Sequence, residues 1–377
     1  MKGTRAKIAT AYIMVLIILA TMPITHAQTH TITYQLLNKP DGKITYTLTV
    51  TIPELLREYY AEKNHRSATA SDFPKFVTPY ALKPIADRLW EIYDREEDFA
   101  NGVLMIVHQI TYVETKPAKY PVETMVDGQG DCDLLSYIAA SIMIAGGLDV
   151  VLLYYETRSH MNLGVHLSSP PTDVRVNTHY ITHNGRKYYI AECTGGNWKS
   201  GWRVGECSDN LKEVPAEVIT LEGAESVATG QVSASFTAVT HSFLSLETPN
   251  IAIQNSAIII EGQLMPAVPN ENITLYASFN GLPWTIIGKT LTQQDGHFQY
   301  KWVANTSGLH SICASWTGND LYAGAMSETK AIMVIPLLLI ALIGITIIAA
   351  IIGAAASLMA KHAQQKNNAT KTILNGP

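Results

Sequence analysis

A long apolar run near the C-terminus limits what that part of the chain can fold into. No charged residue occurs between Lys330 and Lys361, and residues 333–360 are mostly Ile, Leu, Ala and Val. A bilayer core of about 30 Å requires roughly 20 consecutive apolar residues in a helix. A buried helix of a globular domain rarely stays apolar on every face over such a length. We therefore expect one transmembrane helix over residues 333–360.

The N-terminus has the features of a secretory signal peptide. Basic residues within the first seven positions precede an uncharged apolar stretch, and Ala27 offers a small residue before a cleavage point. An uncleaved N-terminal anchor is the alternative. Residues 361–377 contain basic but no acidic side chains, which is typical of the cytoplasmic side of a membrane. The sequence predicts a signal peptide over 1–27, a cytoplasmic tail over 361–377, and a single-pass protein of the cell membrane.

Composition excludes several classes of function for the segment between these ends. The formal net charge of −5 is mild, and no block of Lys and Arg suggests binding to nucleic acid. Four cysteines are too few for a disulfide-based scaffold. The segment is long enough for two domains, at roughly 100–200 residues each. Because it follows a signal peptide, we expect both domains to lie outside the cytoplasm.

The order of the predicted elements favours an α+β domain. Residues 28–52 alternate and are rich in Thr, Ile, Tyr and Val, with turn residues at 38–42, which predicts a β-hairpin. Helical spacing follows over 75–110, and a second helix is expected over 131–145. The strands expected after it are at 150–155, 161–167 and 187–192. A helical first half followed by strands is an α+β pattern.

The second half changes in character. Residues 216–246 are rich in Ser, Thr, Ala and Gly, and we expect them to be a linker. Short β-like runs with turn residues recur over 247–332, a spacing that predicts a β-sandwich.

Cys132 is the strongest candidate for a nucleophile. Asp131 is a good N-cap, so Cys132 is expected in the first turn of a helix. Unpaired backbone N–H groups and the helix dipole there favour an anion and lower the pKa of a thiol. The neighbouring aspartates, Asp131 and Asp133, act in the opposite direction. A charged imidazole close by would restore the balance.

His160 is the expected base, and Glu192 the carboxylate that orients it. His160 begins one predicted strand, and Glu192 ends the next strand but one. Neighbouring strands can hold the two side chains together, which gives a nucleophile, base and orienting carboxylate. His166 is a competing base on the same strand. Taken singly, Cys132, His160 and Glu192 also suit a buried thiol, a hydrogen-bonded strand histidine and a salt-bridged carboxylate.

These segments resemble the transglutaminase-like superfamily, in particular its prokaryotic, often archaeal, membrane-associated members. The resemblance rests on four motifs: Tyr120-Pro121-Val122-Glu123-Thr124, Gly130-Asp131-Cys132-Asp133, His160-Met161-Asn162-Leu163-Gly164-Val165 and Tyr188-Tyr189-Ile190-Ala191-Glu192-Cys193-Thr194. It implies a papain-like fold over residues 28–215, with its core at 75–210. It also implies a catalytic triad of Cys132, His160 and Glu192.

The chain departs from the superfamily pattern at two places. Many members have an Asp followed by Pro-Thr where this chain has Glu192-Cys193-Thr194, and an aromatic residue shortly after the His. The side chain that would bind an oxyanion is left open between Gln129 and Tyr112.

Other residues near the predicted site allow more than one interpretation. Cys193 and Cys207 flank a Gly-rich loop and suit either a small disulfide loop or a pair of buried thiols. Trp198 and Trp202 suit either the wall of a cleft or packing. Zinc binding by Cys132, His160, His166 and Glu192 is disfavoured, because neither His-Glu-x-x-His nor Cys-x-x-Cys occurs. We expect no metal and no cofactor.

The predicted sandwich resembles bacterial Ig-like repeats of cell-surface proteins. The resemblance rests on Gly262-Gln263-Leu264, the run from Asp295 to Trp302, and Trp316-Thr317-Gly318-Asn319. It implies a spacer or adhesive module.

Together these features predict a membrane-anchored thiol enzyme outside the cytoplasm. It would transfer or hydrolyse an acyl group at an amide of a protein or peptide substrate at the cell surface, through a thioester on Cys132. A non-catalytic surface protein that uses the same fold for binding or adhesion is the alternative.

Overall fold

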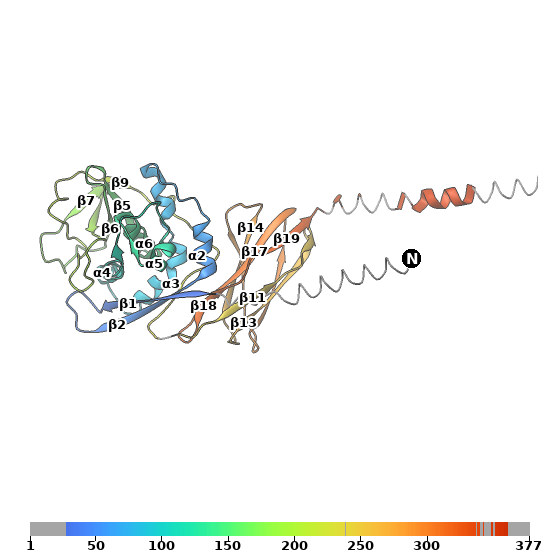
Figure 1. The fold of residues 1–377 in the computed structure, drawn as a ribbon, viewed down its shortest axis with the longest axis horizontal. Helices are drawn as coiled ribbons and strands as arrows, with labels where there is room; N and C mark the ends of the chain where they lie inside the picture. The colour runs from blue at the N-terminus through green and yellow to red at the C-terminus, as the bar shows by residue number, and fades with distance from the viewer. Residues whose placement is uncertain are drawn as a thin grey trace, which may run out of the picture. The chain divides into compact units, whose positions relative to one another are not determined.

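The computed structural model describes residues 28–237, 239–336, 338–339, 342, 348–349 and 351–360, and these form two compact units (Figure 1). Unit 1 consists of the chain up to Ser226 together with residues 231–243 and 317–326. Unit 2 consists of residues 227–230, 244–316 and the chain from Ser327 onward. The predicted signal peptide over 1–27 and the predicted tail over 361–377 lie outside the described residues.

The N-terminal part of unit 1 is the predicted hairpin. Strands β1 (Thr29–Leu37) and β2 (Thr45–Pro53) pair antiparallel, with Tyr34 opposite Leu48. Thr, Ile, Val and Tyr suit a pleated, half-buried surface, and the inward-facing residues of both strands are buried. Strand β10 (Ser233–Ser235) adds to the other side of β2. This sheet therefore joins segments about 180 residues apart in the chain.

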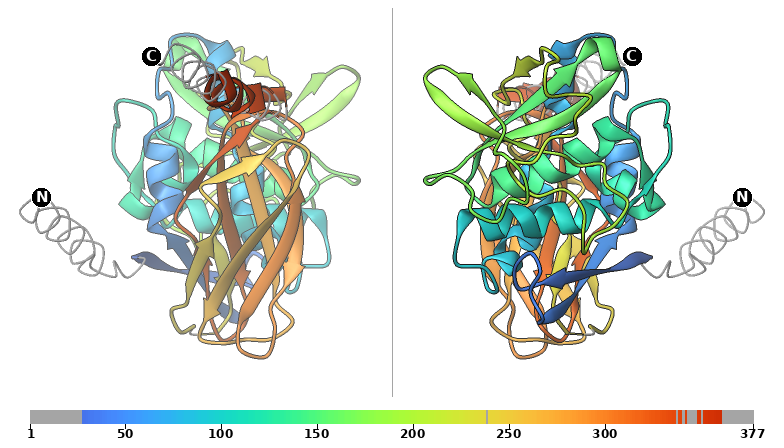
Figure 2. Two further views of the ribbon diagram at one scale, coloured as in Figure 1. Left: turned by 90° about the vertical axis from the view of Figure 1, so that its right-hand side faces the viewer. Right: turned by 90° about the vertical axis from the view of Figure 1, so that its left-hand side faces the viewer.

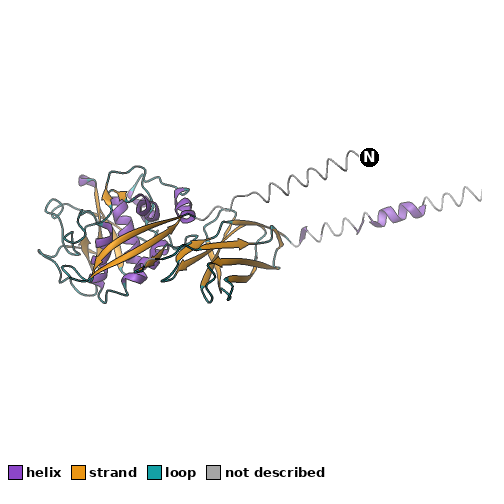
Figure 3. Ribbon diagram, turned by 60° about the horizontal axis from the view of Figure 1, so that its bottom comes forward, coloured by secondary structure: helices purple, strands orange, loops and turns teal. Residues whose placement is uncertain are grey.

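Helices of unit 1 surround a central buried helix, α6. The helices are α2 (Glu54–Ala61), η1 (a 3-10 helix, Ala70–Phe76), α3 (Pro79–Leu89), α4 (Glu96–Val107), α5 (Pro121–Asp127) and α6 (Cys132–Ala145). The helical spacing predicted over 75–110 is divided between α3 and α4. Helix α6 is apolar on nearly every face because α3, α4 and α5 pack around it and a sheet covers it. Figure 3 shows the helices of this unit in purple next to its strands in orange.

That sheet has five strands in the order β7-β8-β6-β5-β9. Its strands are β5 (Asp149–Tyr155), β6 (His160–His166), β7 (Tyr180–His183), β8 (Arg186–Ala191) and β9 (Glu217–Ile219). Strands β6 and β8 pair antiparallel, with Leu163 opposite Ala191. Figure 2 shows the light-green hairpin of β7 and β8 at one edge. A short 3-10 turn, η2 (Glu156–Arg158), connects β5 to β6.

Two short strands connect the helices to the start of α6. Strand β3 (Thr111–Tyr112) pairs in parallel with β4 (Gln129–Gly130). The β4 strand leads directly into α6, so this pairing fixes the entry to the helix.

Unit 2 is built from strands. They are β11 (Phe243–Glu247), β12 (Ile251–Ile253), β13 (Ala257–Met265), β14 (Asn272–Phe279), β15 (Thr285–Leu291), β16 (His297–Val303), β17 (Gly308–Gly318) and β19 (Lys330–Ile335). They form two sheets, β11-β13-β16 and β12-β19-β17-β14-β15. Burial alternates along β13, and Tyr276, Phe298 and Trp316 are fully buried in the core. The remaining strand, β18 (Ala323–Met326), belongs to unit 1.

The predicted membrane anchor over 333–360 is wrong. Its first residues belong to β19, where Met333 pairs with Ile251 of β12 and with Leu309 of β17, and Val334 is buried. Residues 351–360 are helical. Within the part of the chain that the structure describes, no helix combines the length and the apolar character that crossing a bilayer requires. The predictions of the bilayer as a partner and of a single-pass membrane localisation are therefore also wrong.

The predicted fold class is also wrong. A papain-like, transglutaminase-like α+β domain followed by an Ig-like sandwich and a transmembrane helix does not describe this chain. Strands are the commonest element, nineteen of them between Thr29 and Ile335, and the membrane helix is missing from the described residues. Residues 216–246, expected to be a linker, contain β9, β10 and the start of β11. Pairing between distant segments decides these strands, and local composition does not record it.

Candidate functional site

The first turn of α6 places Cys132 as predicted. Asp131 has extended backbone angles and caps the helix, because its Oδ1 atom accepts a hydrogen bond from Leu134 N at 3.4 Å. Its Oδ2 atom accepts a second bond, from Thr115 N at 3.0 Å. Cys132 is then the first helical residue, where the backbone N–H groups have no partner within the helix.

The Cys132 thiol is buried and held in its protonated form. Its side chain is 4% exposed, and Sγ donates to Asp133 Oδ1 at 3.3 Å. Burial and the neighbouring Asp133 carboxylate raise the pKa of the Cys132 thiol well above its usual range. Sequence reasoning expected the helix N-terminus to lower this pKa and the aspartates to oppose it, and in the folded chain burial and Asp133 dominate.

Neighbouring strands bring His160 and Glu192 together, as the sequence predicts. His160 begins β6, and Glu192 directly follows β8. His160 Nε2 lies 2.9 Å from Glu192 Oε2. The β6–β8 register places Glu192 opposite Asn162, on the face of the sheet that also carries His160. The ring is held through Nε2, so the nitrogen for exchanging a proton with a substrate or thiol is Nδ1.

Glu192 is a buried carboxylate with a full set of hydrogen bonds. Oε2 also accepts from Asn162 Nδ2 at 3.2 Å, and Oε1 accepts from Thr194 N at 2.9 Å and Thr194 Oγ1 at 2.6 Å. Burial by itself would raise the pKa of Glu192. The hydrogen bonds and charge of His160, together with the bonds from Thr194, outweigh burial and lower this pKa. Glu192 is therefore a fixed anion that orients the imidazole.

The backbone around His160 joins the thiol to this pair. Cys132 Sγ lies 3.9 Å from the carbonyl oxygen of Ser159, the residue before His160. Ser159 has left-handed angles, with φ of 46°, which are uncommon for a residue other than glycine. One helical turn beyond Cys132, Ser136 Oγ donates to Met161 O at 3.3 Å. The first turns of α6 therefore contact the backbone immediately before and immediately after His160.

The two residues left open for the oxyanion are on neighbouring strands, where Tyr112 is opposite Gly130 and Gln129 is opposite Thr111. Tyr112 of β3 and Gln129 of β4 are on paired strands that lead into α6. Burial, followed by the charge of the nearby Cys132, raises the pKa of Tyr112. Tyr112 therefore lies near the thiol, and the structure leaves the choice between Tyr112 and Gln129 open.

His166, the competing base, is at the opposite end of β6. Its Nδ1 atom lies 2.9 Å from Lys187 O. The structure does not bring it to Cys132.

Sequence reasoning missed three residues that support the site. Asn162 and Thr194 hydrogen-bond to Glu192, and a period of two from His160 and Glu192 would have indicated both. His108, just after α4, is 4% exposed, and its Nε2 atom donates to Glu192 O at 3.0 Å. Burial lowers the pKa of His108, so its ring is neutral. No motif in the sequence marks His108.

The structure contains neither a disulfide between Cys193 and Cys207 nor a metal-binding cluster among its described residues. All four cysteines are free. Across the described ranges no group of three or more His, Cys, Asp or Glu side chains is placed to hold a metal ion. Trp198 and His108 line the same cavity.

Comparisons with known proteins identify no family. No family model and no curated protein matches the chain. Among solved structures, it is similar to the human F-spondin reeler domain (13% identity, TM-score 0.20, 26% of this chain and 95% of that one). A second is the CARDB domain of the PF1109 protein from Pyrococcus furiosus (12% identity, TM-score 0.17, 25% and 87%). A third is a chitin-binding domain from Burkholderia pseudomallei (10% identity, TM-score 0.20, 23% and 56%).

Proposed function

We propose that the chain is a cysteine-dependent enzyme that transfers or hydrolyses an acyl group at an amide, through a thioester on Cys132. The observation that carries this proposal is the hydrogen bond between His160 and Glu192. The residue before His160, Ser159, contacts the Cys132 sulfur through its carbonyl oxygen. A nucleophile, a base and a buried carboxylate that orients the base are the parts that such chemistry requires.

The raised pKa of Cys132 favours one order of events. Because the resting thiol is protonated, its proton passes to His160 as sulfur attacks the amide carbon. The C–S bond forms, and the carbonyl oxygen becomes an oxyanion next to the Cys132 backbone N–H. The C–N bond then breaks as His160 returns the proton to the leaving amine. Glu192 stabilises the imidazolium throughout.

The thioester is resolved by water or by an amine. Water is abundant, whereas an acceptor amine needs a binding site of its own, so hydrolysis is the favoured outcome. The proposed substrate is a peptide or protein amide. The resemblance of the four sequence motifs to the transglutaminase-like superfamily stays a prediction that no comparison tests.

A second candidate is a binding protein without catalysis. The burial of the Cys132 thiol and its bond to Asp133 favour this alternative, because a buried cysteine is commonly inert. The distinction between the two candidates is chemical, so a covalent probe decides it.

The experiment incubates purified protein with p-nitrophenyl acetate and maps the acetylated peptide by mass spectrometry. We expect an acetyl thioester on Cys132 that hydroxylamine removes, and a reduction in its rate of formation of about 100-fold or more in His160→Ala. Cys207→Ser is the matched control and keeps the wild-type rate. Equal rates in wild type and His160→Ala would overturn the enzyme proposal in favour of the binding protein.

A further inference from the structure

A cavity of about 400 Å³ is lined in part by His108, which also contacts the backbone of Glu192 in the candidate site. Its lining includes the buried side chains of Tyr34, His108, Ile110 and Met125, together with Trp198. Sites for small ligands occupy roughly 300–1,000 Å³. This cavity therefore suits one side chain or a small molecule.

The walls of the cavity continue into the segments that carry the site. His108 donates to the backbone carbonyl of Glu192. Gly128, another lining residue, accepts a hydrogen bond from Thr111 N at 3.1 Å, and the chain reaches Cys132 four residues later. Trp198 follows Glu192 by six residues, in the Gly-rich loop. The cavity is therefore connected to the site by one hydrogen bond of His108 and by two short segments of the chain.

The lining of the cavity is uncharged. It contains no Asp, Glu, Lys or Arg. The Gln109 amide is already used, because Nε2 donates to Gln35 O and Met105 O while Oε1 accepts from Gln35 N. The ring of His108 is neutral. A charged group that entered would lose its hydration without gaining a partner, whereas an apolar group would gain by leaving water.

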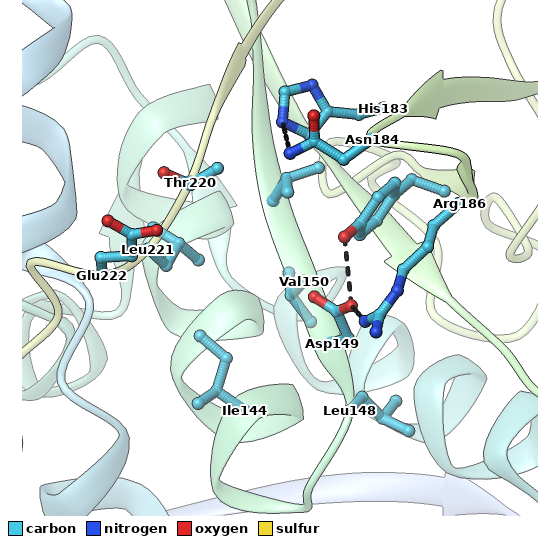
Figure 4. Close-up of a pocket in the computed structure, with 12 residues that line it drawn as sticks. Ile144, Leu148, Asp149, Val150, His183, Asn184, Arg186, Thr220, Leu221 and Glu222 are labelled. Carbon is cyan, nitrogen blue, oxygen red and sulfur yellow. Dashed lines mark hydrogen bonds and ion pairs between the residues drawn. The ribbon is translucent and has the colours of Figure 1, made fainter.

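Another cavity of unit 1 differs in chemistry. It has a volume of about 610 Å³ and is lined by Asp149, Arg186 and Glu222 (Figure 4). Arg186 and Asp149 form an ion pair at 2.6 Å, and Tyr188 donates to the same carboxylate. This cavity gives no preference for an uncharged ligand.

We propose that the uncharged cavity binds an apolar or aromatic side chain of the amide substrate, next to the bond that Cys132 attacks. This inference rests on the proposed function. It defines the substrate class as peptides in which the amide that reacts is next to a bulky, uncharged residue. Lys199 lies 5.1 Å from the Trp198 ring centroid, outside the lining, so an acidic probe is included in the test.

The test measures binding in a chain that cannot react. Saturation-transfer NMR on Cys132→Ala follows N-acetyl-phenylalanine amide, N-acetyl-lysine amide and N-acetyl-glutamate amide. We expect the phenylalanine probe to bind at least fivefold more tightly than either charged probe. Equal affinities for the three probes would overturn the inference.

Two variants, each added to Cys132→Ala, locate the binding. Trp198→Ala removes a wall and Thr33→Phe fills the cavity from β1, and each is expected to weaken binding of the phenylalanine probe at least fivefold. Thr31→Phe is the matched control, because Thr31 is exposed on the same face of β1 but does not line the cavity. If both variants bind as Thr31→Phe does, the probe binds elsewhere and the inference fails.

These outcomes are separate from those of the acetylation experiment. Selective binding without acetylation of Cys132 would leave the cavity assignment standing and remove the enzyme proposal. Acetylation of Cys132 without selective binding would support the enzyme proposal and overturn the cavity assignment. Circular dichroism of each variant confirms that the chain is folded before binding is compared.

Discussion

The Cys132 sulfur and the Asp133 carboxylate form a hydrogen bond of 3.3 Å between adjacent residues of the first turn of α6. The thiol donates, so the bond exists only while Cys132 is protonated. Asp133 therefore opposes formation of the thiolate both through its charge and through this bond.

Replacing Asp133 is expected to make the thiol more reactive. In Asp133→Asn the negative charge is removed and the pKa of Cys132 falls, so a larger fraction of the thiol is ionised at pH 7. We expect alkylation of Cys132 by iodoacetamide to be about two- to tenfold faster than in the wild type. Asp209→Asn, an exposed carboxylate paired with Lys212, is the control. An unchanged alkylation rate across pH 6–9 would show that Asp133 does not set this pKa.

The lowered pKa of Glu192 predicts a loss of stability in acid. The folded chain holds this carboxylate ionised, so the unfolded chain binds more protons as the pH drops. The stabilising contribution is complete above the pKa of the unfolded state, about 4.3, and is lost as the pH falls through the lower folded value. Below about pH 5, the free energy of unfolding measured in urea should therefore fall more for the wild type than for Glu192→Gln.

The control for this comparison is Glu62→Gln, which changes an exposed carboxylate. It should follow the wild-type profile. Parallel pH profiles for the wild type and Glu192→Gln would contradict the assignment of Glu192 as a buried anion.

Gly201 is expected to tolerate no side chain. A Cβ atom there would lie 2.3 Å from His108 Nδ1 and 2.6 Å from the backbone oxygen of Asn197. Gly201→Ala should lower the free energy of unfolding by about 1–3 kcal/mol, as overpacking does. Gly223→Ala is the control, because its Cβ would meet only Pro74, at 3.3 Å. Equal stability of the two variants in urea would show that the loop does not enclose His108.

Thiol titration tests the state of the cysteines. All four are free and buried, so protein purified without reductant should titrate four thiols per chain after denaturation. In the native protein the reaction should be slow. A count of two after denaturation, with a Cys193–Cys207 peptide found by mass spectrometry, would establish a disulfide that the folded chain does not show.

Local patterns predicted the parts of the fold that are made locally. The alternation over 28–52 gave β1 and β2, and Asp131 marked the start of α6 because an N-cap depends on neighbouring residues. The order of strands also placed His160 beside Glu192. The apolar run over 333–360 predicted one helix, but its first three residues end strand β19, because hydropathy alone does not distinguish a strand from a helix. The pairing of β10 with β2 left no local trace.

For the candidate site, the sequence predicts which residues take part but does not predict how they are buried. The identities of Cys132, His160 and Glu192 follow from residue type and order. The raised pKa of Cys132 does not, because it depends on how deeply the thiol is buried. His108 approaches Glu192 from 84 positions away in the chain, and its buried position came only with the packed structure.

The composition of unit 1 from three separate segments has a consequence for the order in which the protein is made. Ser233 pairs with Thr51, and residues 317–326 also belong to this unit. A nascent chain that had left the ribosome only as far as residue 215 would already carry Cys132, His160 and Glu192. It would nevertheless lack β10 and β18, so β2 would present an open edge. The unit that holds the candidate site can therefore close only after residues 317–326, and with them most of unit 2, have been synthesised.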